Sequence, residues 1–321
     1  MKFGINGLNL LRERISCDTF LEKARMNPEA FTRTRKMGAR ELVYYCLNKK
    51  GLCTNMETNN FFDKIGKDEG IRAQSLFDQR KKLSPLVFSD LNDSYLDMFY
   101  SEYSDEARLF KGYVILAIDG SDIEVPNTRA CLENYGLSHN GRSGVARAGV
   151  SICFDLLNHY ILDGLIDRYR APEILSAMKH IDKVKNLPIP QIYIMDRNYV
   201  SLGFMQFFEE RNLKFLCRLK ANSHYIKETA AMVTQDEIVE IKHTKHRRHR
   251  SRYATEEQFQ TMIGKPHTRV RIVKYQLSTG EMEYLITNIE DFSYDDIVKL
   301  YNARWSIMLI SALCAISLNT L

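Results

Sequence analysis

The sequence predicts a mixed α/β protein with a helical segment at its start and a β-rich block late in the chain. Residues 1–105 show helix caps followed by apolar residues at spacings of three and four, the periodicity of an amphipathic helix. After residue 110, short continuous apolar runs alternate with helical stretches, which is typical of buried strands with connecting helices. Residues 222–290 carry strand-like runs separated by polar and basic loops.

These patterns divide the 321 residues into four predicted segments. We expect a helical domain over 1–105, the first part of an α/β core over 106–221, a β-rich insertion over 222–290 and a C-terminal core helix over 291–321. The length agrees with two or three domains, taking roughly 150 residues for each.

The N-terminal segment contains recognisable helix signals. Met37, Leu42, Val43 and Cys46 are spaced to share one helical face, and Ser84-Pro85 is a favourable helix start because Ser caps free N–H groups. Small helical domains with basic residues beside an apolar face often bind DNA, but composition alone favours this no more than a solvated helical bundle.

The core elements follow in order along the chain. We predict strands at 113–118, 145–157, 159–166, 192–195 and 215–219, with a turn at Asn158 and helices at 172–182 and 202–211. Further strands are predicted at 238–241, 269–276 and 282–286, and a capping box at Ser293 and Asp296 begins the last helix.

Composition excludes several classes of protein. Hydrophobic residues make up 45% and charged residues 26%, as in ordinary globular chains. The longest apolar runs fall far short of the ~20 residues of a membrane span, and an odd count of 7 cysteines without a CxxC pair argues against a disulfide framework. We therefore expect a soluble cytoplasmic protein that does not bind membranes.

The net positive charge is small, but basic residues are concentrated in two short segments of the chain. The net charge is +5, from 45 basic and 40 acidic residues, and by itself this does not indicate a nucleic-acid partner. Basic clusters at 33–36 and 242–252 are candidates for phosphate contacts. The histidines of the second cluster lie among Lys and Arg side chains that would repel a metal ion. The candidate DNA-binding residues are Arg33, Arg35, Lys36, Arg80, Lys81, Lys220, Lys245, Arg247, Arg248 and Arg250.

Two aspartates each follow a predicted buried strand. Asp119 comes after the run 113–118, and Asp196 comes after 192–195. In a mixed sheet both could converge at one edge, and carboxylates that lie close together normally hold divalent cations such as Mg²⁺ or Mn²⁺. Aspartates at strand ends are also frequent turn and cap residues, and that reading is the commoner one for an isolated pair.

The residues around both aspartates resemble the motifs of one enzyme family. Residues 117–121 (AIDGS) resemble the D-G-[ST] motif of insertion-sequence-4 DDE transposases, and residues 192–199 (IYIMDRNY) resemble the family's DRGY motif. Residues 301–305 (YNARW) match the start of its signature Y-x₂-R-x₃-E-x₆-K. Segments 74–83, 151–158 and 215–220 are similar to other parts of the family in the same order.

The resemblance implies a ribonuclease-H-like core, interrupted by a β-rich insertion and preceded by a helical DNA-binding domain. Members of the family cut double-stranded DNA at transposon ends and join the ends to a target, using two divalent ions. By position, Asp119 and Asp196 would be the first two metal ligands, and Tyr301 and Arg304 would contact DNA phosphates. It also implies a homodimer on DNA and a location at the nucleoid.

The chain departs from the family pattern at two places. Asn198 replaces the Gly of DRGY, which is a mild change because Asn tolerates left-handed backbone. The third acid should lie at Met308 and the signature lysine at Ala315. Because a thioether is a poor ligand for a hard cation, the resemblance predicts an impaired transposase.

This departure suggests a copy that is truncated or frame-shifted near Leu321, with an incomplete core helix. Two alternatives remain open: a non-catalytic remnant that occupies transposon ends or inhibits an intact transposase, and an unrelated metal-dependent nuclease. Glu281 and Glu283 lie on a predicted insertion strand, so we expect neither to replace the third acid without a rearrangement.

Overall fold

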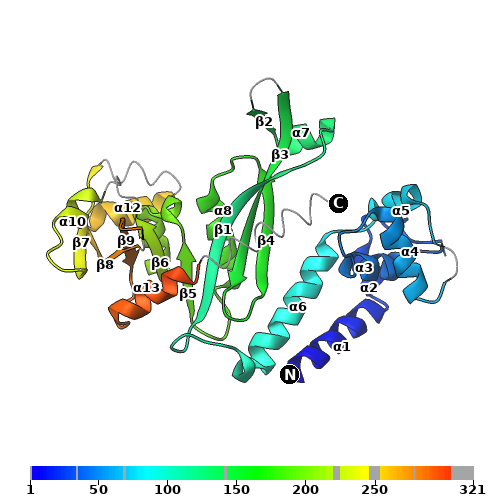
Figure 1. Cartoon of the computed structure of the whole chain (residues 1–321), viewed down its shortest axis with the longest axis horizontal. Helices are drawn as coiled ribbons and strands as arrows, with labels where there is room; N and C mark the ends of the chain where they lie inside the picture. Colours follow the sequence, from blue (N-terminus) through cyan, green and yellow to red (C-terminus); the bar gives the residue numbers. More distant parts are fainter. Residues whose placement is uncertain are drawn as a thin grey trace. The chain divides into compact units, whose positions relative to one another are not determined.

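The computed structural model describes residues 2–33, 35–67, 70–140, 143–219, 225–245, 254–277 and 279–304 (Figure 1). The chain divides into two compact units, one spanning Met1–Ala107 and the other beginning at Arg108. Within the described residues, no helix is both long and apolar enough to cross a membrane.

The first unit consists of helices around a common apolar core. Its helices are α1 (Lys2–Ser16), α2 (Phe20–Ala24), α3 (Ala39–Leu47), α4 (Thr54–Lys64), α5 (Ala73–Arg80) and α6 (Leu86–Glu102), with a 3-10 turn at Ser104–Glu106. Leu42 and Val43 are fully buried in this core and Cys46 is partly buried. The predicted cap at Ser84 is wrong, because Pro85 occupies the N-cap of α6 and no side chain caps that end.

The second unit is built on a nine-stranded mixed sheet. Its strands are β1 (Val114–Glu124), β2 (Leu137–Asn140), β3 (Ser143–Asp155), β4 (Ile161–Arg168), β5 (Gln191–Met195), β6 (Lys214–Leu219), β7 (Asp236–Lys242), β8 (His267–Gln276) and β9 (Met282–Thr287). The order is β2-β3-β1-β5-β6-β9-β8-β7, with β4 beside β3. The pairs β1–β5 and β5–β6 are parallel, and the others are antiparallel.

One feature of this sheet differs from the sequence prediction. Strand β1 does not stop before Asp119 but continues to Glu124, because β3 pairs with it from Leu116 through Glu124. The strands predicted within residues 222–290 extend the same sheet: β9 pairs with β6, and β8 and β7 follow it. This region also contains α10 (Ile226–Ala230) and α12 (Glu256–Gly264).

Helices cover both faces of the sheet. Ile115 and Ala117 of β1 and Ile192 and Ile194 of β5 share a core with α13 (Tyr294–Asn302). Helix α8 (Glu173–Val184) packs against β1, β3 and β4. The remaining elements are α7 (Arg129–Asn134), the 3-10 turn η2 (Arg197–Tyr199) and α9 (Leu202–Glu210).

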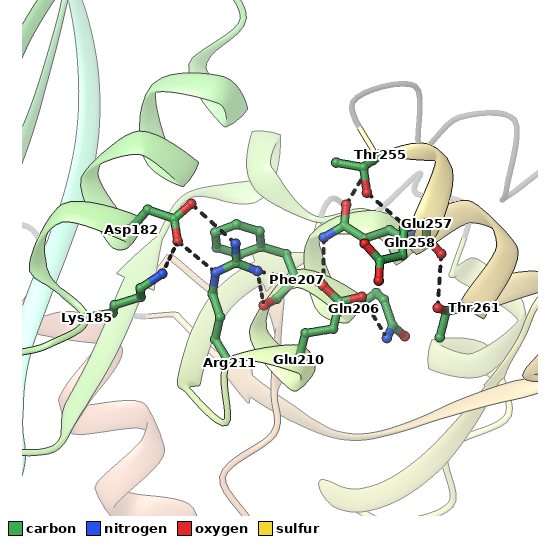
Figure 2. A network of polar contacts seen from close by, with 10 residues as sticks. All are labelled: Asp182, Lys185, Gln206, Phe207, Glu210, Arg211, Thr255, Glu257, Gln258 and Thr261. Atoms are coloured by element: carbon green, nitrogen blue, oxygen red, sulfur yellow. Dashed lines mark hydrogen bonds and ion pairs between the residues drawn. The ribbon is translucent and has the colours of Figure 1, made fainter.

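A polar network joins α8, α9 and α12 (Figure 2). Arg211, just after α9, donates to the Asp182 carboxylate from Nε at 2.9 Å and from Nη2 at 3.3 Å. Its guanidinium carbon lies 3.5 Å from the ring centre of Phe207. On the other side of α9, Gln258 donates to Glu210 at 3.1 Å. These contacts fix the helix that follows Asp196.

Candidate active site

The register of β1 and β5 brings the two predicted aspartates together. Ala117 pairs with Ile194 in the parallel ladder, and Asp119 and Asp196 each follow two residues later. Asp196 remains in extended backbone, with φ −78° and ψ 176°. Because side chains alternate along a strand, both carboxylates lie on the face of Ala117 and Ile194, beyond the last rung between the strands.

The Asp119 carboxyl is in an electrostatically unfavourable position. Burial raises the pKa of Asp119, which disfavours its charged form. The charge of Arg304 and a hydrogen bond from the Gly120 backbone oppose this rise, and the nearby Asp196 carboxylate adds to it. Two carboxylates that act on each other in a half-buried position are suited to binding a cation.

Asp196 lies beside two arginines. Nε of Arg218, on β6, is 3.3 Å from Asp196 Oδ1, and Nη2 of Arg304 is 4.0 Å from the same oxygen. Arg218 also forms an ion pair with Glu283 at 2.6 Å, and the Tyr275 hydroxyl donates to Glu283 at 2.7 Å. Glu283 is therefore near the site but engaged by two partners.

Tyr301 and Arg304, which the resemblance assigned to contacts with DNA phosphates, are both buried. Tyr301 is fully buried in the core under α13, and Arg304 is 4% exposed. The Arg304 guanidinium carbon lies 5.5 Å from the Tyr301 ring centre, and its Nη2 faces Asp196. In this conformation Arg304 acts on the carboxylate pair, because the packing of α13 against the sheet directs it inward.

A cleft of about 450 Å³ opens on the α8 side of β1. Gly120 and Asp122 of β1, Glu173 of α8 and Asn198 of η2 contribute to its lining. Burial raises the pKa of Glu173, the charges of Asp119 and Asp196 raise it further, and a hydrogen bond from the Asn198 side chain opposes the rise. Glu173 is therefore a third carboxylate within electrostatic reach of the aspartate pair.

The predicted DNA-binding residues are distributed over both units. In the first unit, Arg33 and Arg35 line a hollow of about 390 Å³ with Lys82, and Lys36 is exposed. Arg80 is partly buried, and Lys81 pairs with Asp78 at 3.5 Å. In the second unit, Lys245 is exposed. Four other candidates and the degenerate third-acid position lie outside the described residues: Lys220, Arg247, Arg248, Arg250 and Met308.

The donor atoms of the pair fit a hard divalent cation, since they are carboxylate oxygens. Among the residues that the structure describes, no group of three or more His, Cys, Asp or Glu side chains is already assembled around one metal position. Asp119 and Asp196 would therefore hold a cation together with water or DNA oxygens, as Mg²⁺ sites commonly do.

A mixed sheet with two carboxylates at the ends of adjacent parallel strands defines a class of proteins suited to cation-dependent chemistry. The family model for the transposase DDE domain matches residues 110–307, and the chain belongs to this family. It is therefore a transposase by family, a class that binds DNA and generally uses divalent metal ions. A comparison with curated proteins finds no match.

Two residues near the aspartate pair were not identified from the sequence. Arg218 had a usable signal, because it is a charged residue inside the otherwise apolar strand β6. Glu173 had none, since an acid in the first turn of a helix is common. The relation of both residues to the aspartate pair depends on contacts between segments far apart in the sequence.

Proposed function

We propose that this chain is a DDE transposase of the insertion-sequence-4 type, which cuts transposon ends and joins them to target DNA. The observation that carries the proposal is the β1–β5 register, which sets Asp119 and Asp196 side by side at the carboxyl edge of the sheet. The parallel strands β1, β5 and β6, with β3 and β4 antiparallel beside them, support a ribonuclease-H-like core.

In this proposal Asp119 and Asp196 hold Mg²⁺ or Mn²⁺. Bound ions of this kind activate a water or a 3′-hydroxyl and stabilise the leaving oxygen in phosphodiester chemistry. The guanidinium groups of Arg218 and Arg304 offset the negative charge at Asp196. The buried strands below the pair keep the two carboxylates in register.

DNA binding in this proposal uses both basic regions. Arg33 and Arg35 share one hollow with Lys82, and Lys245 begins the basic run that continues to residue 252. Lys and Arg side chains that neutralise phosphates release counterions, so binding weakens as salt rises. A homodimer that holds two transposon ends is part of the same proposal.

Met308 leads us to propose that this transposase is impaired. A thioether at the third-acid position leaves a hard cation without one carboxylate ligand. This feature also favours a second candidate function, that of a DNA-binding protein that occupies transposon ends without cutting them.

Strand cleavage on DNA that carries the element's own ends tests the proposal. We expect the Met308→Glu variant to cut faster than the wild type with Mg²⁺ or Mn²⁺, by at least the roughly 10–100-fold that loss of a partner at a metal site costs. Met308→Leu is the matched control and should cut no faster than the wild type. Asp119→Asn in the Met308→Glu background should abolish cleavage.

Each other result has a definite meaning. If the wild type cuts as fast as Met308→Glu, the proposal that cleavage is impaired is wrong, and another acid acts as the third carboxylate ligand. If Asp119→Asn leaves cleavage unchanged, the assignment of the aspartate pair is wrong. If every variant binds the ends and none cuts, the second candidate function stands.

A further inference from the structure

Arg218 lies between two carboxylates that come from different strands. Its Nη1 atom donates a hydrogen bond to Glu283 Oε1 at 2.6 Å, and its Nε atom lies 3.3 Å from Asp196 Oδ1. The Nε atom of Arg218 and the Oδ1 atom of Asp196 are both buried, and neither makes a hydrogen bond with the described residues. Arg218 is therefore hydrogen-bonded to Glu283, whereas its contact with Asp196 is a longer ion pair without a hydrogen bond.

The pairing of the strands sets this arrangement. Arg218 of β6 is opposite Leu285 of β9, and Glu283 precedes Leu285 by two residues. Because alternate residues of a strand share a face and diagonal neighbours are within reach of long side chains, Arg218 and Glu283 meet across the β6–β9 pair. Leu285 belongs to the core that α13 covers. The carboxylates of Asp119 and Asp196 lie on this same face of the sheet.

Glu283 is held on its other side by a buried tyrosine. Tyr275 of β8 is directly opposite Glu283 in the β8–β9 pair, and its hydroxyl donates to Glu283 Oε2 at 2.7 Å. Tyr275 is 6% exposed, and the side chains of Glu283 and Arg218 are 13% and 19% exposed. Charges that are shielded from water in this way act on each other more strongly than surface pairs do. Both oxygens of Glu283 therefore have a fixed partner.

These contacts decide how much positive charge Asp196 receives. An arginine paired fully with Asp196 would occupy the carboxylate and repel a divalent cation. Glu283 offsets the charge of Arg218, and its hydrogen bond to Nη1 keeps the guanidinium from closing onto Asp196. The Asp196 carboxylate thus keeps a buried oxygen that is not hydrogen-bonded by the described residues.

We propose that Glu283 is a positioning residue of the cation site: it holds Arg218 and offsets its charge, so that Asp196 remains able to bind a divalent cation. The inference rests on the proposed function and deepens it. Glu283 does not bind the cation in this proposal and acts only through Arg218, while Tyr275 fixes the Glu283 carboxylate in the orientation that Arg218 requires.

Calorimetric titration of the full chain with Mn²⁺, in the absence of DNA, tests this inference. It compares the wild type with Glu283→Gln, with Arg218→Gln, with the double variant that carries both changes, and with Asp119→Asn. Glu281→Gln is the matched control, because Glu281 is an exposed acid two residues before Glu283. Circular dichroism and the thermal midpoint show whether each variant is folded.

We expect Glu283→Gln to weaken Mn²⁺ binding by about 10-fold, because Arg218 then competes with the ion for Asp196. Arg218→Gln should bind Mn²⁺ more tightly than the wild type, and the double variant should regain at least the wild-type affinity. Asp119→Asn should abolish binding, and Glu281→Gln should leave it unchanged. A purely structural role of Glu283 would not be reversed by the loss of a second shielded side chain.

The double variant keeps the test decisive if a single variant does not fold, because it replaces the ion pair with two neutral side chains of similar size and leaves no shielded charge without a partner. In this folded variant, an Mn²⁺ affinity below that of the wild type contradicts the inference.

Failure of the inference is distinguishable from failure of the proposed function. If Asp119→Asn abolishes binding while Glu283→Gln binds like the wild type, or Arg218→Gln binds no more tightly, Glu283 only stabilises the sheet and the aspartate site stands. If the wild type and Asp119→Asn bind Mn²⁺ equally, or neither binds it, the proposed cation site fails and the role of Glu283 fails with it.

Discussion

Two groups of buried polar side chains in the second unit differ in how fully they are satisfied. Asp163 accepts hydrogen bonds from His180 at 2.6 Å and from Lys183 at 3.0 Å, and His180 reaches Ser151 with its other nitrogen. Asp119 instead stands half-buried near a second carboxylate, Asp196, whose Oδ1 forms ion pairs with Arg218 and Arg304 but makes no hydrogen bond with the described residues.

The difference separates a structural network from a binding site. Burial raises the pKa of Asp163, but hydrogen bonds from His180 and Lys183 lower it by more. The charged form of Asp163 therefore stabilises the folded state. Burial and the charge of Asp196 raise the pKa of Asp119, so the charged form of Asp119 destabilises the folded state. A carboxylate kept at such a cost is expected where a ligand, here a cation, compensates for it.

The largest expected effect is the loss of His180. His180→Ala removes both side-chain contacts of a fully buried ring, and among the described residues it leaves Lys183 as the side chain that donates to Asp163. We expect the free energy of unfolding, measured by urea denaturation, to fall by about 3 kcal/mol. Lys179→Ala, an exposed position on the same helix, is the control. A loss below about 1 kcal/mol for His180→Ala would show that the network contributes little to stability.

A smaller effect, of opposite sign, is expected at the candidate site. Asp119→Asn removes the repulsion with Asp196 and the cost of burying a charge, while the amide oxygen can still accept from Gly120. In EDTA the free energy of unfolding should stay the same or rise by up to about 1 kcal/mol. A decrease of more than about 2 kcal/mol would mean that Asp119 is a structural residue like Asp163.

The smallest effect is on the pH dependence of stability. Because the folded pKa of Asp163 is depressed below its ordinary value of 3.8, its contribution is present above that pH and is lost as the pH falls through the folded pKa. The raised pKa of Asp119 has the reverse consequence: its cost is present at neutral pH and is relieved as the pH falls towards 3.8.

Unfolding of Asp163→Asn and Asp119→Asn between pH 3 and 7 measures this difference. As the pH falls from 7, any gain in stability of Asp119→Asn should begin to shrink first, because the folded pKa of Asp119 is raised. The deficit of Asp163→Asn should shrink only at the acidic end, because the folded pKa of Asp163 is lowered. Identical profiles for the two variants would remove the distinction between the two groups.

Much of the fold was predictable because its signals are local. Strands β5 and β6 and helices α8 and α9 agree with the predicted runs to within one or two residues, since buried strands are continuously apolar and helices carry a repeating apolar face. The end of β1 was not predictable in this way. Asp119 and Gly120 are typical turn residues, and only their pairing with β3 keeps them in a strand.

The same distinction holds at the candidate site. By themselves, the residues around Asp119 and Asp196 determined which acids to consider and which family they resemble, because those motifs are contiguous in the chain. Only the tertiary structure decided that Arg304 faces Asp196, that Arg218 bridges Asp196 and Glu283, and that Glu173 lies against Gly120. Each of these contacts joins elements that meet only after the sheet has formed, so the residues near either partner contain no local signal of it.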